Sequence, residues 1–312
     1  MKKLLLLAAV LFIPLFAAFS YEFVLADNDT SFLIFGPETA FPGDPVIIKI
    51  SPVSPETSVL RGFAAIKRAD SQKNTSKAEL YATGSGDMYA ALLPLDSFVK
   101  SGDYNVHINI TLSSSAVFDK TIPLTIQPKD FVSETIELNP TNTAIKTDKS
   151  TKRAKQIERL NAVLFTNNYD ALYMKDENFV FPVQSKRRTS FYGDRRIYAY
   201  SNGKSETSVH YGIDFGVPKG TPVCACATGK VVMAEERITT GWTVVIEHMP
   251  GLYSLYYHLD SYSVKTGDMV KRGEQIGLSG STGLATGPHL HWEIRLLGVA
   301  INPDYFIETK IY

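Results

Sequence analysis

Short β-forming segments separated by Gly, Pro, Asp and Ser constrain the fold of this chain most strongly. They recur between residues 27 and 128 at about every ten to fifteen residues. In one of them, Tyr104–Leu112, apolar and polar residues alternate, which predicts one buried face. This spacing predicts an immunoglobulin-like β-sandwich over 27–128. The candidate strands are Phe32–Phe35, Val46–Ile50, Val59–Ile66, Ala78–Ala82, Met88–Leu93, Tyr104–Leu112 and Ile122–Ile126.

The length of 312 residues predicts about two domains, joined here by a connector over 129–178. Within it, residues from Asp148 to about Asn167 carry an apolar stripe at helical spacing, so we expect one amphipathic helix capped by Asp148 or Ser150. We expect the stripe to pack between the domains and Asn139-Pro140 to start a turn. The stripe consists of Ile157, Leu160, Val163 and Leu164. The remaining residues, 179–312, are β-rich with Gly-rich loops, so the whole protein is predicted to be mainly β.

Four of the six histidines lie in three short motifs, His210-Tyr-Gly-Ile-Asp214, Tyr257-His258-Leu259 and His289-Leu-His291. Side chains of a strand alternate between its two faces, so His289 and His291 share a face, as do His210 and Asp214. Two such strands can present these groups to one groove. Imidazole nitrogen and carboxylate oxygen suit Zn²⁺, and a catalytic zinc site uses three protein ligands with one open position. The motifs therefore predict a single metal site.

These motifs, with the Gly280–Glu293 segment that contains the third, resemble the signature of the lysostaphin/LytM-type zinc metallopeptidases. The resemblance covers roughly residues 180–307. Further similar segments are Phe181-Pro182, Ser190–Arg195, Gly216–Pro222, Ala227–Val232, Gly267–Gly273 and Asn302-Pro303. Members of this family are endopeptidases that cut the peptide part of peptidoglycan. The resemblance implies an antiparallel β domain with a narrow groove over 179–312.

The resemblance also implies a role for each motif residue. His210, Asp214 and His291 are expected to bind Zn²⁺, while His258 and His289 are the two histidines of the active site that do not bind the metal. A bound zinc polarises the scissile carbonyl, and the two free imidazoles can accept or donate protons or bind the oxyanion. Which histidine does which is left open.

Two functional hypotheses follow from the resemblance. The first is a zinc-dependent endopeptidase that hydrolyses peptide cross-links of peptidoglycan. The alternative is a non-catalytic activator or adaptor of other cell-wall hydrolases, because some relatives have lost metal ligands. All five site residues are present here, which favours catalysis. The N-terminal domain can bind the wall, bind a cell-wall or divisome partner, or cover the groove. We expect a monomer.

The charge balance and the N-terminus limit where the protein acts. Lys and Arg number 32, as do Asp and Glu, so nothing favours nucleic acid as a partner. Lys2-Lys3 and the apolar run Leu4–Phe19 are typical of a signal peptide over 1–26, cleaved after Ser20 or Ala26. We therefore expect export to the periplasm or cell envelope, as a secreted protein. An uncleaved membrane anchor is the less favoured alternative.

The remaining histidines and both cysteines are expected to have no role in the reaction. His107 alternates with apolar residues and should be exposed, and His248 is also expected to be incidental. Cys224 and Cys226 are two apart in a predicted strand, where a disulfide would strain the backbone. We expect them to be reduced and buried as small apolar side chains.

Overall fold

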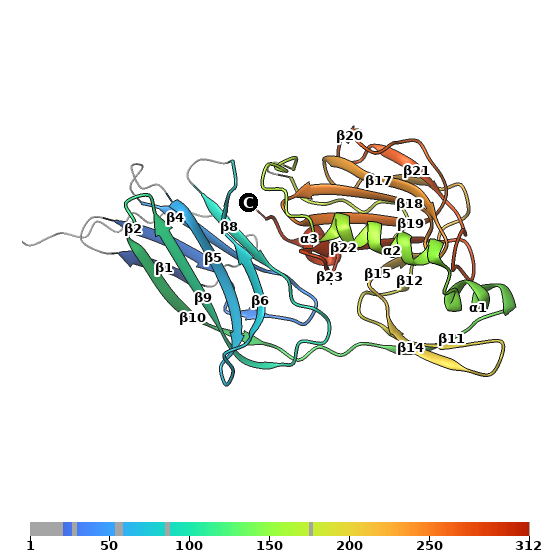
Figure 1. Ribbon diagram of the computed structural model, residues 1–312, viewed down its shortest axis with the longest axis horizontal. Helices are drawn as coiled ribbons and strands as arrows, with labels where there is room; N and C mark the ends of the chain where they lie inside the picture. Colours follow the sequence, from blue (N-terminus) through green and yellow to red (C-terminus); the bar gives the residue numbers. More distant parts are fainter. Residues whose placement is uncertain (1–20, 27–29, 54–58, 85–87, 175–176, 312) are drawn as a thin grey trace, which may run out of the picture.

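The computed structural model describes residues 21–26, 30–53, 59–84, 88–174 and 177–311, with side chains from residue 30 onward. Two β-rich bodies lie side by side and are joined by an extended segment that leads from β10 to β11 (Figure 1). The prediction of a mainly β protein is confirmed. The expected signal peptide falls largely on residues 1–20, which lie outside the described residues. No helix in the described part of the chain has the length and apolar character needed to cross a bilayer.

The N-terminal body consists of two five-stranded sheets. The first has the order β1 (Tyr21–Ala26), β2 (Ser31–Gly36), β4 (Val46–Pro52), β8 (Tyr89–Leu93), β7 (Tyr81–Ala82). The second has the order β3 (Thr39–Ala40), β10 (Val117–Ile126), β9 (Gly102–Leu112), β5 (Val59–Arg68), β6 (Asn74–Glu79). Strand β1 lies upstream of residue 27, where the sequence analysis placed the start of this domain.

One hydrophobic core fills the space between these two sheets. It draws residues from both, for example Ile48 and Ile50 from β4 and Ile108 and Ile110 from β9. Alternate residues of β9, from Tyr104 to Leu112, are buried as the alternation predicts. In β9 the buried face is therefore set by the period of two of the strand, whereas β4 buries residues on both of its faces.

The connector differs from its prediction in one strand and one helix. Residues Ser133–Glu137 form β11, and a helix, α1 (Pro140–Thr147), replaces the expected turn. Asn139 caps it, since the Oδ1 atom of Asn139 accepts a bond of 2.8 Å from the Asn142 amide. An Asn followed by Pro starts helices as readily as turns, because Pro suits the first helical position.

The second connector helix, α2 (Thr151–Leu164), is the predicted amphipathic helix, with Ser150 as its N-cap. Its stripe does not pack between the domains. Leu164 is buried, and Leu160 and Val163 are partly buried, against β17 (Gly229–Arg237), β18 (Gly241–Met249) and β19 (Leu252–Tyr262) of the C-terminal body. Ile157 is exposed. The helix thus covers one face of the C-terminal sheet, as Figure 1 shows.

A ten-stranded sheet and a three-stranded sheet build the C-terminal body. The main path of the large sheet is β12 (Arg188–Ser190), β15 (Gly212–Phe215), β22 (Leu290–Leu296), β19, β18, β17, β20 (Met269–Val270). Strands β16 (Pro222–Cys224), β21 (Gln275–Ser279) and β23 (Val299–Ile301) pair off this path, and α3 (Asp304–Glu308) follows. The small sheet has the order β11, β13 (Arg195–Ala199), β14 (Ser205–Val209). Its first strand thus comes from the connector.

A buried polar cluster holds His248 in the core of this body. The Nδ1–H group of His248 donates to the Thr228 carbonyl at 2.9 Å, and Nε2 lies 2.7 Å from Ser254 Oγ. Cys226 is buried beside it, with Sγ at 3.7 Å from His248 Nε2, and Cys224 is half-buried. Both cysteines are free thiols, so the expected reduced state matches, but only Cys226 is fully buried.

We predict that His248 makes the fold sensitive to mild acid. Burial lowers the pKa of His248 from 6.5 to about 4, so the folded state stays unprotonated there while the unfolded state binds a proton. The contribution of unprotonated His248 to stability is complete above pH 6.5. It is lost as the pH falls towards 4, which lowers the free energy of unfolding by up to about 3 kcal/mol. Denaturant unfolding between pH 7 and 4.5 measures this loss. The His248→Gln variant should lose less over the same range, and an equal loss would contradict the prediction.

Candidate metal centre

Two neighbouring antiparallel strands bring the first and third histidine motifs together. Asp214 of β15 and His291 of β22 are directly opposite partners, so their side chains emerge on the same side of the sheet. His210 precedes β15 rather than lying in it, yet its ring turns back to the same point. Between them, a Cβ atom added to Gly212 would lie 2.3 Å from the Trp292 carbonyl oxygen. Only glycine allows these strands to approach so closely.

We predict that Gly212→Ala weakens both the fold and the metal centre. The new methyl group would push β15 away from β22, lowering the free energy of unfolding by about 1–3 kcal/mol. It would also separate Asp214 from His291. Denaturant unfolding and zinc titration measure the two effects. Gly287→Ala is the matched control for stability, because a Cβ atom there meets nothing within 4 Å. Equal stability of the two variants would contradict the close-approach argument.

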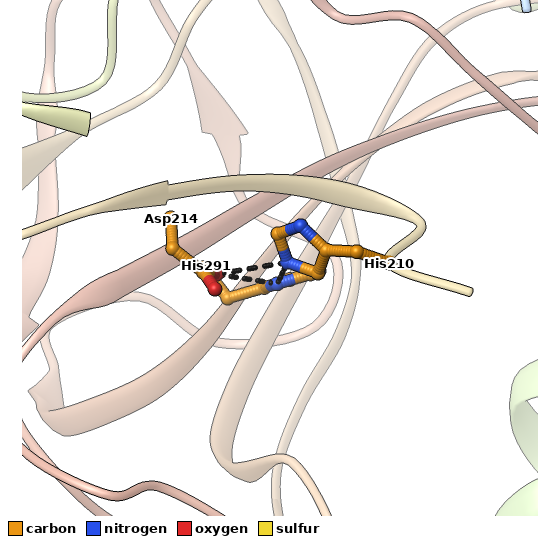
Figure 2. Close-up of side chains that lie close together, drawn as sticks. All are labelled: His210, Asp214 and His291. Carbon is orange, nitrogen blue, oxygen red and sulfur yellow. Dashed lines mark hydrogen bonds and ion pairs between the residues drawn. The ribbon is translucent and has the colours of Figure 1, made fainter. Parts of the chain in front are cut away.

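Three side chains, those of His210, Asp214 and His291, form a compact triangle of possible ligand atoms (Figure 2). His210 Nε2 lies 3.0 Å from Asp214 Oδ1 and 2.9 Å from His291 Nδ1. The third edge, between His291 Nδ1 and Asp214 Oδ1, is 2.8 Å. All three residues are buried. The grouping that the spacing predicted is therefore present in the structure.

A polar partner at the far side of each ring turns the other ring nitrogen towards this triangle. His210 Nδ1 donates to the Phe191 carbonyl at 2.8 Å, which leaves the lone pair on Nε2. His291 Nε2 lies 3.5 Å from a carboxylate oxygen of Glu293, which leaves Nδ1 facing the triangle. Partners of this kind fix the tautomer and orientation of metal-binding histidines. Glu293 is buried beside His291.

The electrostatics of the triangle favour a cation. Burial alone would raise the pKa of Asp214, but its contacts with His210 and His291 hold that pKa well below the ordinary value. Burial lowers the pKa of His210, and its contact with Asp214 only partly offsets this. For His291, burial is outweighed by Asp214 and Glu293, which raise the pKa to about 9. A carboxylate held ionised among buried imidazoles is a natural cation ligand.

The donor set fits Zn²⁺. Two imidazole nitrogens and one carboxylate oxygen are common zinc ligands, and three protein ligands leave a fourth tetrahedral position. With zinc–ligand bonds of about 2.0–2.2 Å, neighbouring ligand atoms are roughly 3.3 Å apart. The observed edges of 2.8–3.0 Å are slightly shorter, so an ion would enter with a small outward movement of the three side chains.

The other two predicted histidines lie next to the triangle. The rings of His258 and His289 have centroids 4.8 Å apart, and His289 Nε2 is 3.8 Å from Asp214 Oδ1. Their Nδ1 atoms donate, at 2.8 Å each, to the Thr282 and Gly287 carbonyls. Both Nε2 atoms therefore keep a lone pair. Burial and the neighbouring histidines lower the pKa of His258 to about 3. The structure thus brings all five predicted site residues together.

Residues 208–303, which contain all five, match the model of peptidase family M23. The C-terminal domain of this chain belongs to peptidase family M23. Among the relatives of the M23 domain, peptidoglycan DD-endopeptidase ShyA of Vibrio cholerae is 42% identical over 123 residues, 39% of this chain and 28% of ShyA. DD-carboxypeptidase/endopeptidase Mpg of Neisseria meningitidis is 45% identical over 95 residues, 30% of this chain and 22% of Mpg. The chain thus matches about a quarter of the length of these curated relatives.

A solved structure extends the likeness beyond the M23 domain. The crystal structure of a Pseudomonas aeruginosa protein, named for peptidase M23, has a TM-score of 0.56 and 22% identity. The alignment covers 86% of this chain and 95% of that chain. At this identity the comparison establishes the fold alone. The fold of this chain, over the 86% that the alignment covers, is therefore shared with a known structure.

A groove of about 530 Å³ leads to the triangle of the M23 domain. The small sheet and α1 form one wall, and the loop before His289 forms the other. The first wall includes Glu134, Ile136, Leu138, Lys146, Arg196 and Tyr198, and the second includes Leu284, Thr286, Gly287 and Pro288. Asn142 of α1 donates to the Ala285 carbonyl at 3.1 Å and so joins the two walls. A segment of the connector thus shapes the groove.

Sequence reasoning missed three residues around the site. Tyr257 stacks on His291, with ring centroids 5.2 Å apart and planes within 7°. Arg196 donates to Asp214 Oδ2 at 2.8 Å, and Glu134 binds Arg196 in turn. Tyr257 was visible in the motif beside His258, but strand alternation puts adjacent residues on opposite faces. Tyr257 faces the site through its pairing with His291, and His258 also reaches it because its positive φ breaks the alternation. Arg196 and Glu134 carried no such signal.

Proposed function

We propose that this protein is an exported, zinc-dependent endopeptidase that hydrolyses peptide cross-links of peptidoglycan. The observation that carries the proposal is the convergence of five residues, three as a buried ligand triangle and two as free imidazoles beside it. The names of the curated relatives support peptidoglycan as the substrate and favour a D,D cross-link over a glycine bridge. The adaptor alternative would have been favoured by a missing ligand, and all three are present.

In this proposal His210, Asp214 and His291 hold the zinc. A bound Zn²⁺ supplies Lewis-acid polarisation of the scissile carbonyl and lowers the pKa of water. The groove places the peptide against it, and the buried position of the triangle limits competing solvent.

His258 and His289 are the proposed proton carriers. Each donates through Nδ1 to a backbone carbonyl, so each keeps the Nε2 lone pair needed to accept a proton from the attacking water. The same nitrogen, once protonated, donates to the leaving amine or to the oxyanion. Tyr198 lines the groove and can add a donor, whereas Tyr200 bonds to Glu206.

The N-terminal body supports a further part of the proposal, an immunoglobulin-like fold. Its sheets β2-β4-β8-β7 and β10-β9-β5-β6 have the strand orders A-B-E-D and G-F-C-C′ when the strands are lettered from β2. We propose that this domain, over about 27–128, positions the enzyme in the cell envelope through the wall or a divisome partner. We also propose that the protein acts as a monomer.

Digestion of purified peptidoglycan by zinc-loaded full-length protein tests the proposed function. Muropeptides are resolved by mass spectrometry, with a chelated sample alongside. We expect cross-linked dimers to disappear and monomers to accumulate only in the zinc-loaded sample, and the new peptide ends name the bond. Zinc-loaded protein that leaves the dimers intact would overturn the proposal and favour the adaptor.

A further inference from the structure

The two carboxylate oxygens of Asp214 have separate partners. Oδ1 lies 2.8 Å from His291 Nδ1 and 3.0 Å from His210 Nε2, inside the triangle. Oδ2 points away from it and accepts from Arg196 Nη2 at 2.8 Å. Because the guanidinium occupies Oδ2, the carboxylate offers a single oxygen to the centre. The Arg196 contact thus engages Oδ2 and leaves Oδ1 facing the triangle.

Glu134 fixes the guanidinium of Arg196 from the other side. Arg196 Nε donates to Glu134 Oε1 at 3.0 Å, and the side chain of Arg196 is 12% exposed. The Ser190 hydroxyl donates to the same Oε1 atom at 3.1 Å. The Glu134 side chain is 34% exposed, so the pair is shielded mainly on its arginine side, where it is screened less than a fully exposed surface pair.

Backbone pairing closes these contacts into a ring. Glu134 and Arg196 are partners in the parallel pair β11–β13, and Ser190 and Asp214 are partners in β12–β15. Side-chain contacts join Ser190 to Glu134 and Arg196 to Asp214. Asp214 cannot rotate without breaking the Arg196 contact, and Arg196 cannot follow it without breaking the Glu134 contact. The ring links the small sheet to the large one.

The charges of the ring also complement a dication. Two neutral imidazoles, one carboxylate and Zn²⁺ carry a net single positive charge. Arg196 adds a second positive charge at a carboxylate that binds the ion, which would weaken metal binding if it were unbalanced. Glu134 supplies the compensating negative charge. Both members of the pair are therefore needed, Arg196 for orientation and Glu134 for neutrality.

We propose that Arg196 and Glu134 are positioning residues for the metal ligand Asp214, so that strand β11 is part of the metal centre. The proposal rests on the proposed function for the identity of the ion. Strand β11 begins at Ser133, soon after β10 ends at Ile126, and the segment matched to the family begins only at residue 208. The connector thus does more than join two domains, because it completes the charge balance of the active site.

Zinc affinity of full-length variants, measured by chelator competition, tests the proposal. Arg196→Met should bind zinc about 10–100-fold more weakly, the usual effect of losing a partner of a metal ligand. Glu134→Gln should also weaken binding, and Arg196→Lys should restore part of it. Arg195→Met is the matched control, since Arg195 is the next residue of β13 but bonds to Ser97 of the N-terminal body. Its zinc affinity should equal that of the native protein.

Two further readouts separate positioning from a general structural role. In Arg196→Met the freed Oδ2 can join the metal, so the Co²⁺-substituted variant should show the weaker visible absorption of a higher coordination number. The double variant Arg196→Met/Glu134→Gln should bind zinc no more weakly than Arg196→Met alone, because the two residues act as one unit.

Failure of this proposal is distinguishable from failure of the proposed function. Suppose that the native protein binds zinc and that Arg196→Met and Glu134→Gln show native-like zinc affinity and Co²⁺ absorption. This result would overturn the positioning role alone. If metal-free Arg196→Met does not fold, the zinc affinities of Glu134→Gln and Arg196→Lys decide instead. Native-like affinity in both variants would overturn the positioning role. Native protein that binds no zinc would overturn the proposed function and the positioning role together.

Discussion

Replacement of His291 by alanine is expected to remove both zinc binding and peptidoglycan cleavage. His291 Nδ1 is one of the three proposed ligand atoms and lies 2.9 Å from His210 Nε2. Two remaining ligands cannot hold zinc in a closed geometry, so affinity should fall by more than about 100-fold, since even outer partners contribute 10–100-fold. Metal content after dialysis measures the loss of zinc, and the muropeptide digest measures the loss of turnover.

The His107→Ala variant is the matched control for this substitution. His107 lies in β9 of the N-terminal body, partly exposed, with its Nδ1 3.0 Å from Thr121 Oγ1. Its loss should leave zinc content and cleavage unchanged. Zinc retained at native stoichiometry in His291→Ala would show that the ion binds elsewhere, and the ligand triangle would have to be abandoned. Retained cleavage by a zinc-free variant would instead contradict the metal dependence of the reaction.

Part of the candidate site was predictable, because the placement of Asp214, His289 and His291 follows strand periodicity. His210 precedes its strand and His258 has a positive φ, so periodicity does not place these two. Strand alternation puts His289 and His291 on one face, and the glycine of the first motif permits the close strand approach that brings Asp214 opposite His291. The short spacing within the first and third motifs thus accounts for the placement of Asp214 and His291. The assignment of ligand and non-ligand roles came from the family resemblance, not from spacing.

Arg196 and Glu134 were not predictable from the sequence. They lie 62 positions apart, and their contact depends on a parallel pairing of β11 with β13 that no local pattern encodes. Charged residues in short segments are usually solvated, so neither stood out. The connector was mispredicted for a related reason. Asn139-Pro140 suits a turn and a helix start equally, and only the docking of α1 beside the groove selects the helix.

The alternation rule also worked in the N-terminal body, where β9 buries alternate residues from Tyr104 to Leu112. It could not say how the second connector helix docks. Leu160 and Leu164 pack on the face of β17–β19, while Ile157 of the same stripe is exposed. A helical stripe predicts that some surface will cover it, but the choice between a neighbouring domain and the adjoining sheet depends on the tertiary path of the chain.

Substitution of His258 by asparagine is expected to lower kcat by about 10²–10⁴-fold, the usual contribution of a proton-transferring side chain, while zinc affinity stays native. Asparagine is the informative choice because His258 has a φ of 59°, a left-handed conformation that asparagine tolerates and alanine does not. The backbone can then keep its place while the proton acceptor is lost. Steady-state cleavage of a soluble cross-linked muropeptide gives kcat and KM, and chelator competition gives the zinc affinity.

The same measurements on His289→Asn complete this prediction, because the two imidazoles lie 4.8 Å apart and both keep a free Nε2. If one accepts the proton and the other stabilises the oxyanion, each variant loses kcat with little change in KM, since both act on the transition state. The double variant then falls further than either single one. Native kcat in His258→Asn with zinc bound would remove this residue from the reaction. A selective rise in KM would instead make it a substrate-binding group, held in its left-handed conformation to contact the peptide rather than to move a proton.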